Sequence, residues 1–192
     1  LSKHLDLFRK KYNYYFQEMI DYLKIKNGIF SVQGIIFNNE FYPYDPGFRL
    51  QGEGQHLILN HINGIDYLDE LINFSFTNKF LNKKLIKKND VLLKGYHVSS
   101  VWVLLKKGKI NSIKNIEKIQ KHKNVFKIVN RLRKNDVINN KMIGTEKQVF
   151  SRIYLKAKSK IELIRSINFI HKKLKITNIQ NKNLIIKYFN LI

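Results

Sequence analysis

The sequence has no cysteine, few acidic side chains and no long hydrophobic run. The absence of cysteine excludes a disulfide-bonded scaffold, a cysteine nucleophile, and zinc or iron–sulfur centres held by thiolates. No apolar run approaches the ~20 residues that a membrane-spanning helix needs, and no secretory-signal pattern occurs near the N-terminus. We therefore expect a cytoplasmic protein that has no membrane partner.

The composition is nevertheless that of a folded protein. The 192 residues are 44% hydrophobic and 12% aromatic, which is enough apolar material for a packed core and excludes general disorder. A chain of this length forms one large domain or two small ones. Because the first residue is Leu1 and not methionine, we expect the chain to be part of a longer protein.

Positive charge is concentrated in the second half of the chain. The net charge is +22, of which residues 1–100 contribute +3 and residues 101–192 contribute +19. Surfaces that bind phosphate backbones carry charge of this sign and size. However, the lysines occur singly or in pairs, and no RNA-binding motif accompanies them, so nucleic acid is not the expected partner. A basic, non-enzymatic module for RNA or another polyanion remains the alternative, and its affinity would fall steeply with salt.

Hydrophobic periodicity predicts mixed secondary structure in the first half. Apolar residues at three- and four-residue spacing predict a helix over 3–24, and alternating β-branched and aromatic residues predict strands over 29–37 and 41–45. A loop rich in glycine follows over 45–54. Two short helices are then expected over 55–62 and 65–76, and a connector rich in lysine and asparagine over 79–92.

The second half shows the same mixture. We expect strands over 98–105, 110–113, 125–132 and 148–158, a turn over 106–109, a helical turn or two over 115–122, and a helix over 161–174. The predicted fold class is α+β, in two parts that divide near residue 90.

Polar residues in the predicted hairpin point to a functional site. Gln33 interrupts an apolar strand, Asp45 ends the next strand, and Arg49 follows among glycines. If Asn38 and Asn39 form a plain two-residue loop, Gln33 faces residue 44, whereas a three-residue loop or a bulge brings it opposite Asp45. The second register predicts a core face made of Phe30, Val32, Ile36, Tyr42 and Tyr44. The simpler alternative is an ordinary glycine-rich turn in which Asp45 acts as a cap.

The residue types at this site suit phosphate chemistry. An amide oxygen and a carboxylate on neighbouring strands can share Mg²⁺, which takes oxygen ligands and bridges to phosphates. The planar guanidinium of Arg49 suits a phosphate or a carboxylate. Glycines, here Gly47, Gly52 and Gly54, allow the backbone to approach the same anion.

The stretch from Gly28 to Gly54, GIFSVQGIIFNNEFYPYDPGFRLQGEG, resembles the metal-binding hairpin of the ATP-grasp superfamily. In that hairpin a Glu or Gln precedes an E-x-N-x-R pattern by twelve residues, as Gln33 precedes the segment from Asp45 to Arg49. Gln33 matches the glutamine of carbamoyl-phosphate-synthase-like members. Asp45 replaces the usual glutamate and Gly47 replaces the usual asparagine, which indicates an altered metal site or a degenerate lobe.

The resemblance implies that residues 1–90 form the C-terminal lobe of an ATP-grasp domain, an antiparallel sheet with helices. Residues 91–192 would be a small α+β C-terminal domain. The implied activity is ATP-dependent ligation of a carboxylate to an amine through an acyl phosphate, in surface-polysaccharide or peptide-type biosynthesis. An upstream lobe of the same protein would supply the rest of the site.

The resemblance also implies roles for individual residues. Gln33 and Asp45 would bind Mg²⁺, and Arg49 would contact the transferred phosphate or the substrate carboxylate. The glycine-rich loop, with Gly47, Gly52 and Gly54, would contact ATP.

Two further polar residues lie in or beside the same loop. Two roles remain open for Glu53. It approaches the metal or the incoming amine, or it caps a helix. His56 follows the loop and could touch substrate, although its spacing favours a structural or surface role.

Overall fold

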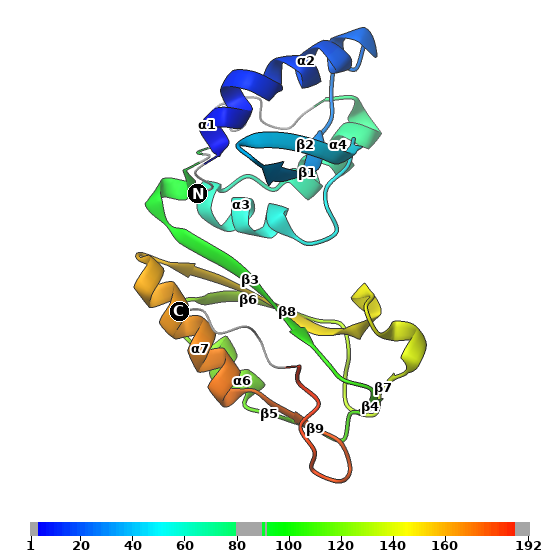
Figure 1. Cartoon of the computed structure of the whole chain (residues 1–192), viewed down its shortest axis with the longest axis vertical. Coiled ribbons are helices and arrows are strands. Elements are labelled where there is room, and N and C mark those ends of the chain that lie inside the picture. The colour runs from blue at the N-terminus through cyan, green and yellow to red at the C-terminus, as the bar shows by residue number, and fades with distance from the viewer. Residues whose placement is uncertain (1–3, 80–89, 91, 187–192) are drawn as a thin grey trace. The chain divides into compact units, whose positions relative to one another are not determined.

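The computed structural model describes residues 4–79, 90 and 92–186 (Figure 1). The chain forms two compact units, Leu1–Lys94 and Gly95–Ile192. Most of the predicted connector over 79–92 lies outside the described residues.

The first unit begins with an interrupted helix. It consists of α1 (Leu5–Leu7), a π-helical turn over Phe8–Tyr12, and α2 (Asn13–Tyr22), where the sequence predicts one continuous helix. Aromatic side chains attach this helix to the hairpin that follows it. The ring of Phe8 lies 5.4 Å from that of Phe41, and the ring of Phe16 lies 5.6 Å from that of Phe30.

The hairpin consists of β1 (Ser31–Phe37) and β2 (Glu40–Gly47). Asn38 and Asn39 form a two-residue turn with φ values of +48° and +60°, a conformation that asparagine tolerates better than most residues. The ladder is regular from the turn as far as the pair Gly34 and Pro43, after which the register shifts. Tyr44 is the extra residue of this β-bulge, so the next pair is Gln33 and Asp45.

The predicted core face of the hairpin is wrong for Ile36, Tyr42 and Tyr44, whose side chains are 40%, 53% and 63% exposed. The two-residue turn pairs Ile36 with Phe41, so Phe41 shares the inner face and Tyr42 points the other way. The shift that brings Gln33 opposite Asp45 occurs only beyond Pro43. The sequence analysis expects the extra residue at or beside the turn, and the structure has it at Tyr44 instead.

Two helices complete the first unit: α3 (Gln55–Asn63) and α4 (Tyr67–Thr77). Each lies within two residues of its predicted bounds. Gly64 ends α3 at φ +72°, and the Asp66 carboxylate starts α4 by accepting hydrogen bonds from the backbone N–H groups of Leu68 and Asp69. Figure 1 shows α2 on one side of the hairpin and α3 on the other.

The second unit is built on a three-stranded antiparallel sheet in the order β3 (His97–Leu104), β8 (Val149–Ala157), β6 (Val125–Asn130). The central strand β8 is buried along almost its whole length because α7 (Lys160–Lys173) and the neighbouring strands cover it. The core comprises Val101, Val103, Leu105, Ile110, Ile119, Ile138, Phe150, Ile153, Leu155, Ile167, Ile170, Leu174, Ile176 and Leu184.

Short elements surround this sheet. β4 (Gly108–Lys109) pairs with β7 (Val137–Ile138), and β5 (Ser112–Lys114) pairs with β9 (Lys175–Thr177). The helix α6 (Ile116–Gln120) and 3₁₀ turns over Asn140–Met142 and Glu146–Gln148 complete the unit. A further 3₁₀ turn, Leu93–Gly95, spans the point at which the chain passes from the first unit to the second.

The predictions over 106–113 are partly wrong. The expected turn over 106–109 contains β4, and the expected strand over 110–113 is divided, because Ile110 is fully buried between β4 and β5. The short partners β7 and β9 escaped prediction because two or three residues are too few to show a period.

Helices and antiparallel sheets thus confirm the α+β class. Among the residues that the structure describes, no helix combines the length and the apolar character needed to cross a bilayer.

Candidate functional site

Gln33 and Asp45 lie directly opposite each other on the two strands of the hairpin. The bulged residue beside them contributes a contact of its own, since the hydroxyl of Tyr44 donates a hydrogen bond to Oε1 of Gln33 over 3.1 Å. A carbonyl oxygen has two lone pairs, so this bond leaves one acceptor position on Gln33. The structure therefore places an amide oxygen and a carboxylate side by side.

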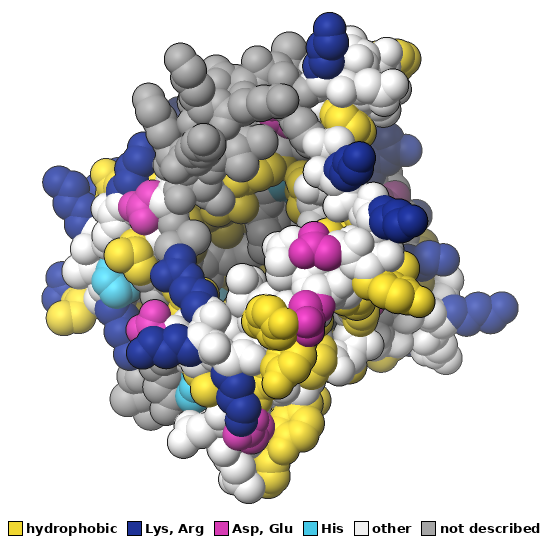
Figure 2. Space-filling view, turned by 90° about the horizontal axis from the view of Figure 1, so that it is seen from above, with side chains coloured by type: hydrophobic (Ala, Val, Ile, Leu, Met, Phe, Trp, Pro, Cys, Tyr) yellow, Lys and Arg dark blue, Asp and Glu magenta, His cyan; other side chains and the backbone are white. Residues whose placement is uncertain are grey.

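These two residues share one face of the hairpin with exposed apolar side chains. Because successive strand residues alternate between faces, Gln33 lies on the same face as Ile35 and Phe37, and Tyr42 joins them as the partner of Ile35. Ile35 and Phe37 are 62% and 63% exposed. In the view of Figure 2, hydrophobic side chains lie at the surface between charged ones.

The opposite face is fixed to the N-terminal helix. A side chain at Gly34 would overlap the ring of Phe41, so only glycine lets that ring lie across the strand. Near the turn, Tyr12 donates to the Glu40 carboxylate and accepts from the backbone N–H of Phe41, and Lys11 lies 2.5 Å from Glu40. Hydrogen bonds from Lys11 and Tyr12 hold the pKa of Glu40 below its usual range.

The Asp45 carboxylate has no hydrogen bond or ion pair with any residue that the structure describes. The described residues also contain no cluster of three or more histidine, aspartate or glutamate side chains that could enclose a metal ion. A site with one carboxylate and one amide oxygen suits Mg²⁺, which commonly takes one or two protein ligands and completes its shell with water and phosphate oxygens.

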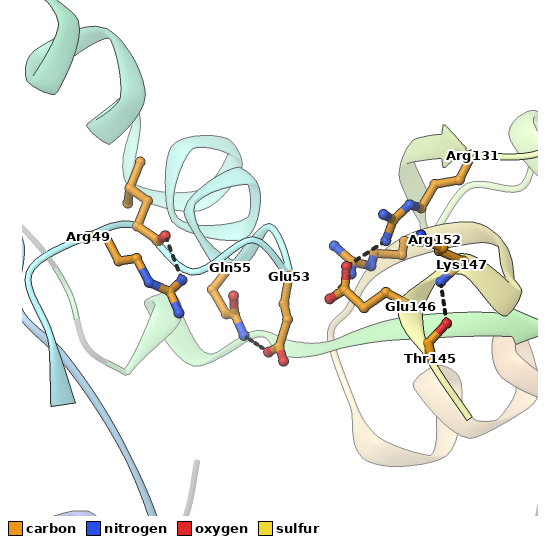
Figure 3. A network of polar contacts seen from close by, with 9 residues as sticks. Arg49, Glu53, Gln55, Arg131, Thr145, Glu146, Lys147 and Arg152 are labelled. Atoms are coloured by element: carbon orange, nitrogen blue, oxygen red, sulfur yellow. Dashed lines mark hydrogen bonds and ion pairs between the residues drawn. The ribbon is translucent and has the colours of Figure 1, made fainter. Parts of the chain in front are cut away.

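Arg49 follows the end of β2 and is exposed. Its guanidinium makes one long hydrogen bond, 3.4 Å from Nη1 to the carbonyl of Leu50 (Figure 3). The aliphatic part of the side chain runs past Gly47, where an added Cβ would meet Arg49 Cγ at 3.8 Å. Most of the guanidinium donors are therefore available to an anion.

The three predicted glycines differ in what the fold requires of them. Gly54 has φ +81° and forms the N-cap of α3, a conformation that favours glycine. At Gly52 an added Cβ would meet no atom within 4 Å, and at Gly47 the contacts would be ordinary ones. The fold itself thus explains Gly54 but leaves the glycines at 47 and 52 unexplained. Glu53, between them and α3, accepts a 2.6 Å hydrogen bond from Gln55 (Figure 3).

A cavity of about 260 Å³ lies beside Arg49. It is lined by residues from β1, the glycine-rich loop, α3 and α4: Ile29, Ser31, Arg49, Leu50, Gln51, Gln55, His56, Leu59 and Tyr67. Nδ1 of His56, one of the lining residues, is buried and has no hydrogen-bond partner among the residues that the structure describes. Sequence reasoning singled out Arg49 and His56 separately but missed the cavity, which arises only when the helices fold back on the strand.

A second cavity of about 250 Å³ lies between α2, α4 and the start of β1. Its lining includes Ile20, Phe30 and Leu71, and Tyr67 borders both cavities. Burial raises the pKa of the Tyr67 hydroxyl above its ordinary value, so this group stays neutral at physiological pH. The lining of this second cavity also includes the polar residues Lys26, Asn27 and the buried Glu70.

The second unit carries a charged network that the sequence analysis did not predict. Glu146 accepts hydrogen bonds from Arg131 over 2.8 Å and from Arg152 over 2.9 Å (Figure 3). Arg152 is 6% exposed, and its guanidinium lies 4.2 Å from the ring centroid of Trp102. The hydrogen bond from Arg131, with the positive charge of Arg152, lowers the pKa of Glu146.

Known structures resemble this fold, although a scan of protein-family models and a search of curated proteins gave no significant match. Two of the similar structures are a ligase and a synthetase. An L-amino acid ligase from Bacillus licheniformis superposes with a TM-score of 0.67 and 15% identity, over 85% of this chain and 42% of that one. A phosphoribosylglycinamide synthetase from Anaerococcus prevotii superposes with a TM-score of 0.66 and 17% identity, over 85% of this chain and 40% of that one.

At these identities the likeness concerns the fold alone. The chain spans about two fifths of the length of each of these structures.

Proposed function

We propose that this chain is part of an ATP-dependent ligase that joins a carboxylate to an amine. In the reaction, a carboxylate oxygen of the substrate attacks the γ-phosphorus of ATP, which forms an acyl phosphate and releases ADP. The amine nitrogen then attacks the acyl carbon, inorganic phosphate leaves, and the nitrogen loses a proton. We further propose a carbamoyl-phosphate-synthase-like member that acts in surface-polysaccharide or peptide-type biosynthesis.

The pairing of Gln33 with Asp45 is the observation that carries this proposal. It brings together the two side chains that the ATP-grasp resemblance assigns to Mg²⁺, in a chain whose fold resembles parts of a ligase and a synthetase. When bound, Mg²⁺ would neutralise charge on the phosphate oxygens. In the proposed site, Gln33 and Asp45 each offer it one oxygen.

Arg49 would orient the anion that reacts. Its planar guanidinium can bind two oxygens of a phosphate or a carboxylate at once, and among the described residues one long hydrogen bond, to the carbonyl of Leu50, competes for it. Positioning and charge neutralisation are the main contributions that a protein makes to phosphoryl transfer. We propose that the loop with Gly47, Gly52 and Gly54 lies against ATP, because a Cβ added at Gly47 or Gly52 would make no close contact with the described residues, which leaves space beside the backbone for a ligand.

The rest of the active site would come from elsewhere in a longer protein. We propose that residues 1–90 form one lobe of the ATP-binding domain and that residues 91–192 form an accessory domain. The exposed face of the hairpin, with Ile35, Phe37 and Tyr42, would contact the bound nucleotide or an upstream lobe of the same protein.

The test is the substitution Asp45→Asn in the intact protein, with ATP turnover measured as a function of Mg²⁺ concentration. Removing the carboxylate charge should lower turnover by about a hundredfold or more, because the metal loses its one charged protein ligand. Asp69→Asn is a matched control, since it removes the same charge from an exposed position on α4. If Asp45→Asn and Asp69→Asn turn over ATP at the same rate, the metal assignment is wrong.

A further inference from the structure

We infer that a polar cavity in the second unit binds a small phosphate ester that also carries hydroxyl groups. The cavity has a volume of about 260 Å³ and is lined by Lys109, Asn111, Asn135, Asn178, Ile179 and Gln180. All six residues belong to the second unit, so the inference is independent of the ligase site proposed for the first unit.

Backbone pairing brings these side chains together from distant segments. The backbone N–H of Asn111, between β4 and β5, donates to the carbonyl of Thr177 over 2.8 Å, and that of Asn135, just before β7, donates to the carbonyl of Ile110 over 2.8 Å. Residues 178–180 follow β9, the partner of β5. The fold thus fixes the backbone at each position and leaves the side-chain amides of the two asparagines unused by these bonds.

The Asn178 side chain has a fixed orientation. Its Oδ1 accepts hydrogen bonds from the backbone N–H groups of Gln180 over 3.0 Å and of Lys182 over 2.9 Å. A carbonyl oxygen has two lone pairs, so both acceptor positions are occupied, and turning the amide over would break both bonds. The part of Asn178 that remains for a ligand is its NH₂ group, which can only donate.

The charge of the lining residues favours an anion. Lys109 is exposed and makes no ion pair with any residue that the structure describes. No acidic residue lines the cavity. Asp136, which follows Asn135, accepts a hydrogen bond from the backbone N–H of Arg133 and lies outside the lining. An ammonium group with amide donors and no carboxylate suits a phosphate, whose several oxygens all accept charge-assisted hydrogen bonds.

The other amides determine the rest of the ligand. The side chains of Asn111, Asn135 and Gln180 have no hydrogen-bond partner among the described residues. Each amide offers both a donor and an acceptor, and a hydroxyl group can satisfy both. The lining contains no aromatic ring on which a base could stack, which argues against a nucleotide.

The size of the cavity limits the ligand to a few carbon atoms. A cavity of ~150 Å³ holds one benzene molecule, so a cavity of about 260 Å³ suits roughly ten non-hydrogen atoms. A phosphate ester of a three-carbon polyol has this size. We therefore take glycerol 3-phosphate as the probe.

The experiment is calorimetric titration of the intact protein at about 0.15 M salt, where long-range attraction to the basic surface is largely screened. Glycerol 3-phosphate should bind saturably at one site, whereas glycerol should not bind. Inorganic phosphate should bind about tenfold more weakly than the ester, because it cannot reach the amides that would contact the hydroxyl groups. Absence of saturable binding by glycerol 3-phosphate, or equal affinity for inorganic phosphate, would overturn the inference.

Variants of Lys109 test the role of the charge. Lys109→Met should weaken binding of glycerol 3-phosphate about tenfold or more, and Lys109→Arg should stay within about threefold of the wild type. Lys114→Met is the matched control, since it removes the same charge from an exposed position on β5 outside the lining. Equal affinities in Lys109→Met and Lys114→Met would refute the role of Lys109.

Asn178→Asp tests the fixed donor without removing the contacts that hold the loop. The aspartate keeps an oxygen for the two backbone N–H groups, so the unfolding midpoint should not change, but a negative charge replaces the NH₂ group and should weaken binding about thirtyfold or more. Asn139→Asp is the control, because Asn139 Oδ1 likewise accepts a backbone N–H, that of Lys141 over 3.0 Å, outside this cavity. Equal binding by the two variants would contradict the inference.

A polymer of phosphates is the competing ligand for the same residues. If a short RNA oligonucleotide binds, Lys109→Met weakens that binding, and glycerol 3-phosphate does not bind, these residues belong to a polyanion-binding surface and the inference is wrong. None of these titrations depends on whether Asp45→Asn lowers ATP turnover, because Asp45 lies in the first unit.

Discussion

The hydroxyl of Tyr44 donates a hydrogen bond to the side-chain oxygen of Gln33, 3.1 Å away, from the one residue that the hairpin ladder leaves unpaired. The bulge thus does two things at once. It shifts the register so that Asp45 faces Gln33, and it provides the group that orients the Gln33 amide. β-Bulges often re-aim side chains next to active sites in this way.

The first prediction concerns this hydrogen bond. Tyr44→Phe should leave the free energy of unfolding within about 0.5 kcal/mol of the wild type, because the ring is 63% exposed. The Gln33 amide would lose its orientation, so the Mg²⁺ concentration needed for half-maximal ATP turnover should rise by about threefold to tenfold. Tyr15→Phe, at a similarly exposed tyrosine on α2, serves as the control. An identical Mg²⁺ dependence in both variants would contradict the prediction.

The second prediction concerns the close approach of Phe41 to the strand at Gly34. Gly34→Ala should lower the free energy of unfolding by about 1–3 kcal/mol, because the new methyl group overlaps the Phe41 ring and would lie 2.8 Å from the backbone oxygen of Tyr42. Thermal or urea unfolding measures this loss. A Gly34→Ala variant as stable as the wild type would show that the hairpin and the N-terminal helix are not packed as described.

Gly52→Ala, unlike Gly34→Ala, should leave the stability unchanged and weaken the use of ATP. No atom lies within 4 Å of the added methyl group, so the unfolding midpoint should not change. If the loop lies against ATP, the same methyl group should raise the KM for ATP by about fivefold or more. An unchanged KM for ATP would remove Gly52 from the proposed site.

The fourth prediction concerns the charged network of the second unit. Glu146→Gln should lower the free energy of unfolding at pH 7 by about 1–2 kcal/mol, because Arg152 is 6% exposed and would lose its charged partner. Since the pKa of Glu146 is lowered in the folded state, its contribution is present above the ordinary value near 4.5 and is lost as the pH falls below it.

The urea midpoint of the wild type should therefore decrease between pH 7 and pH 3.5, and that of Glu146→Gln should decrease less. Some dependence will remain in the variant, because the pKa values of Glu40 and Glu162 are also lowered in the folded state. Parallel pH profiles of the wild type and the variant would show that Glu146 makes no such contribution.

The sequence was a good guide wherever local chemistry decides the structure. The turn at Asn38 and Asn39 and the ends of α3 at Gly54 and Gly64 follow from residues that tolerate a positive φ. The start of α4 follows from the Asp66 side chain, which accepts hydrogen bonds from adjacent backbone. The lengths of α3, α4, β8 and α7 follow from apolar periodicity. These features depend on contacts within a few residues, which a single sequence displays directly.

The sequence was a poor guide wherever distant segments meet. Register arguments allowed Gln33 to face either residue 44 or Asp45, and packing of Phe41 onto Gly34 under the N-terminal helix accompanies the second arrangement. The exposure of Tyr42 and Tyr44 follows from that arrangement. The short strands β7 and β9 form by antiparallel pairing with β4 and β5, which are distant in the sequence.

The sequence by itself determined the α+β class, most of the helices, and the residue types that suit a magnesium and phosphate site. Only the tertiary structure decided which of these residues are neighbours: Gln33 with Asp45 across a bulge, Arg49 with His56 around one cavity, and Arg152 with Glu146 over Trp102. The physical reason is that residue type and periodicity reflect local backbone preferences and burial. Which residues are neighbours depends on the packing of segments that are far apart in the chain, and a single bulged residue is enough to change the pairing.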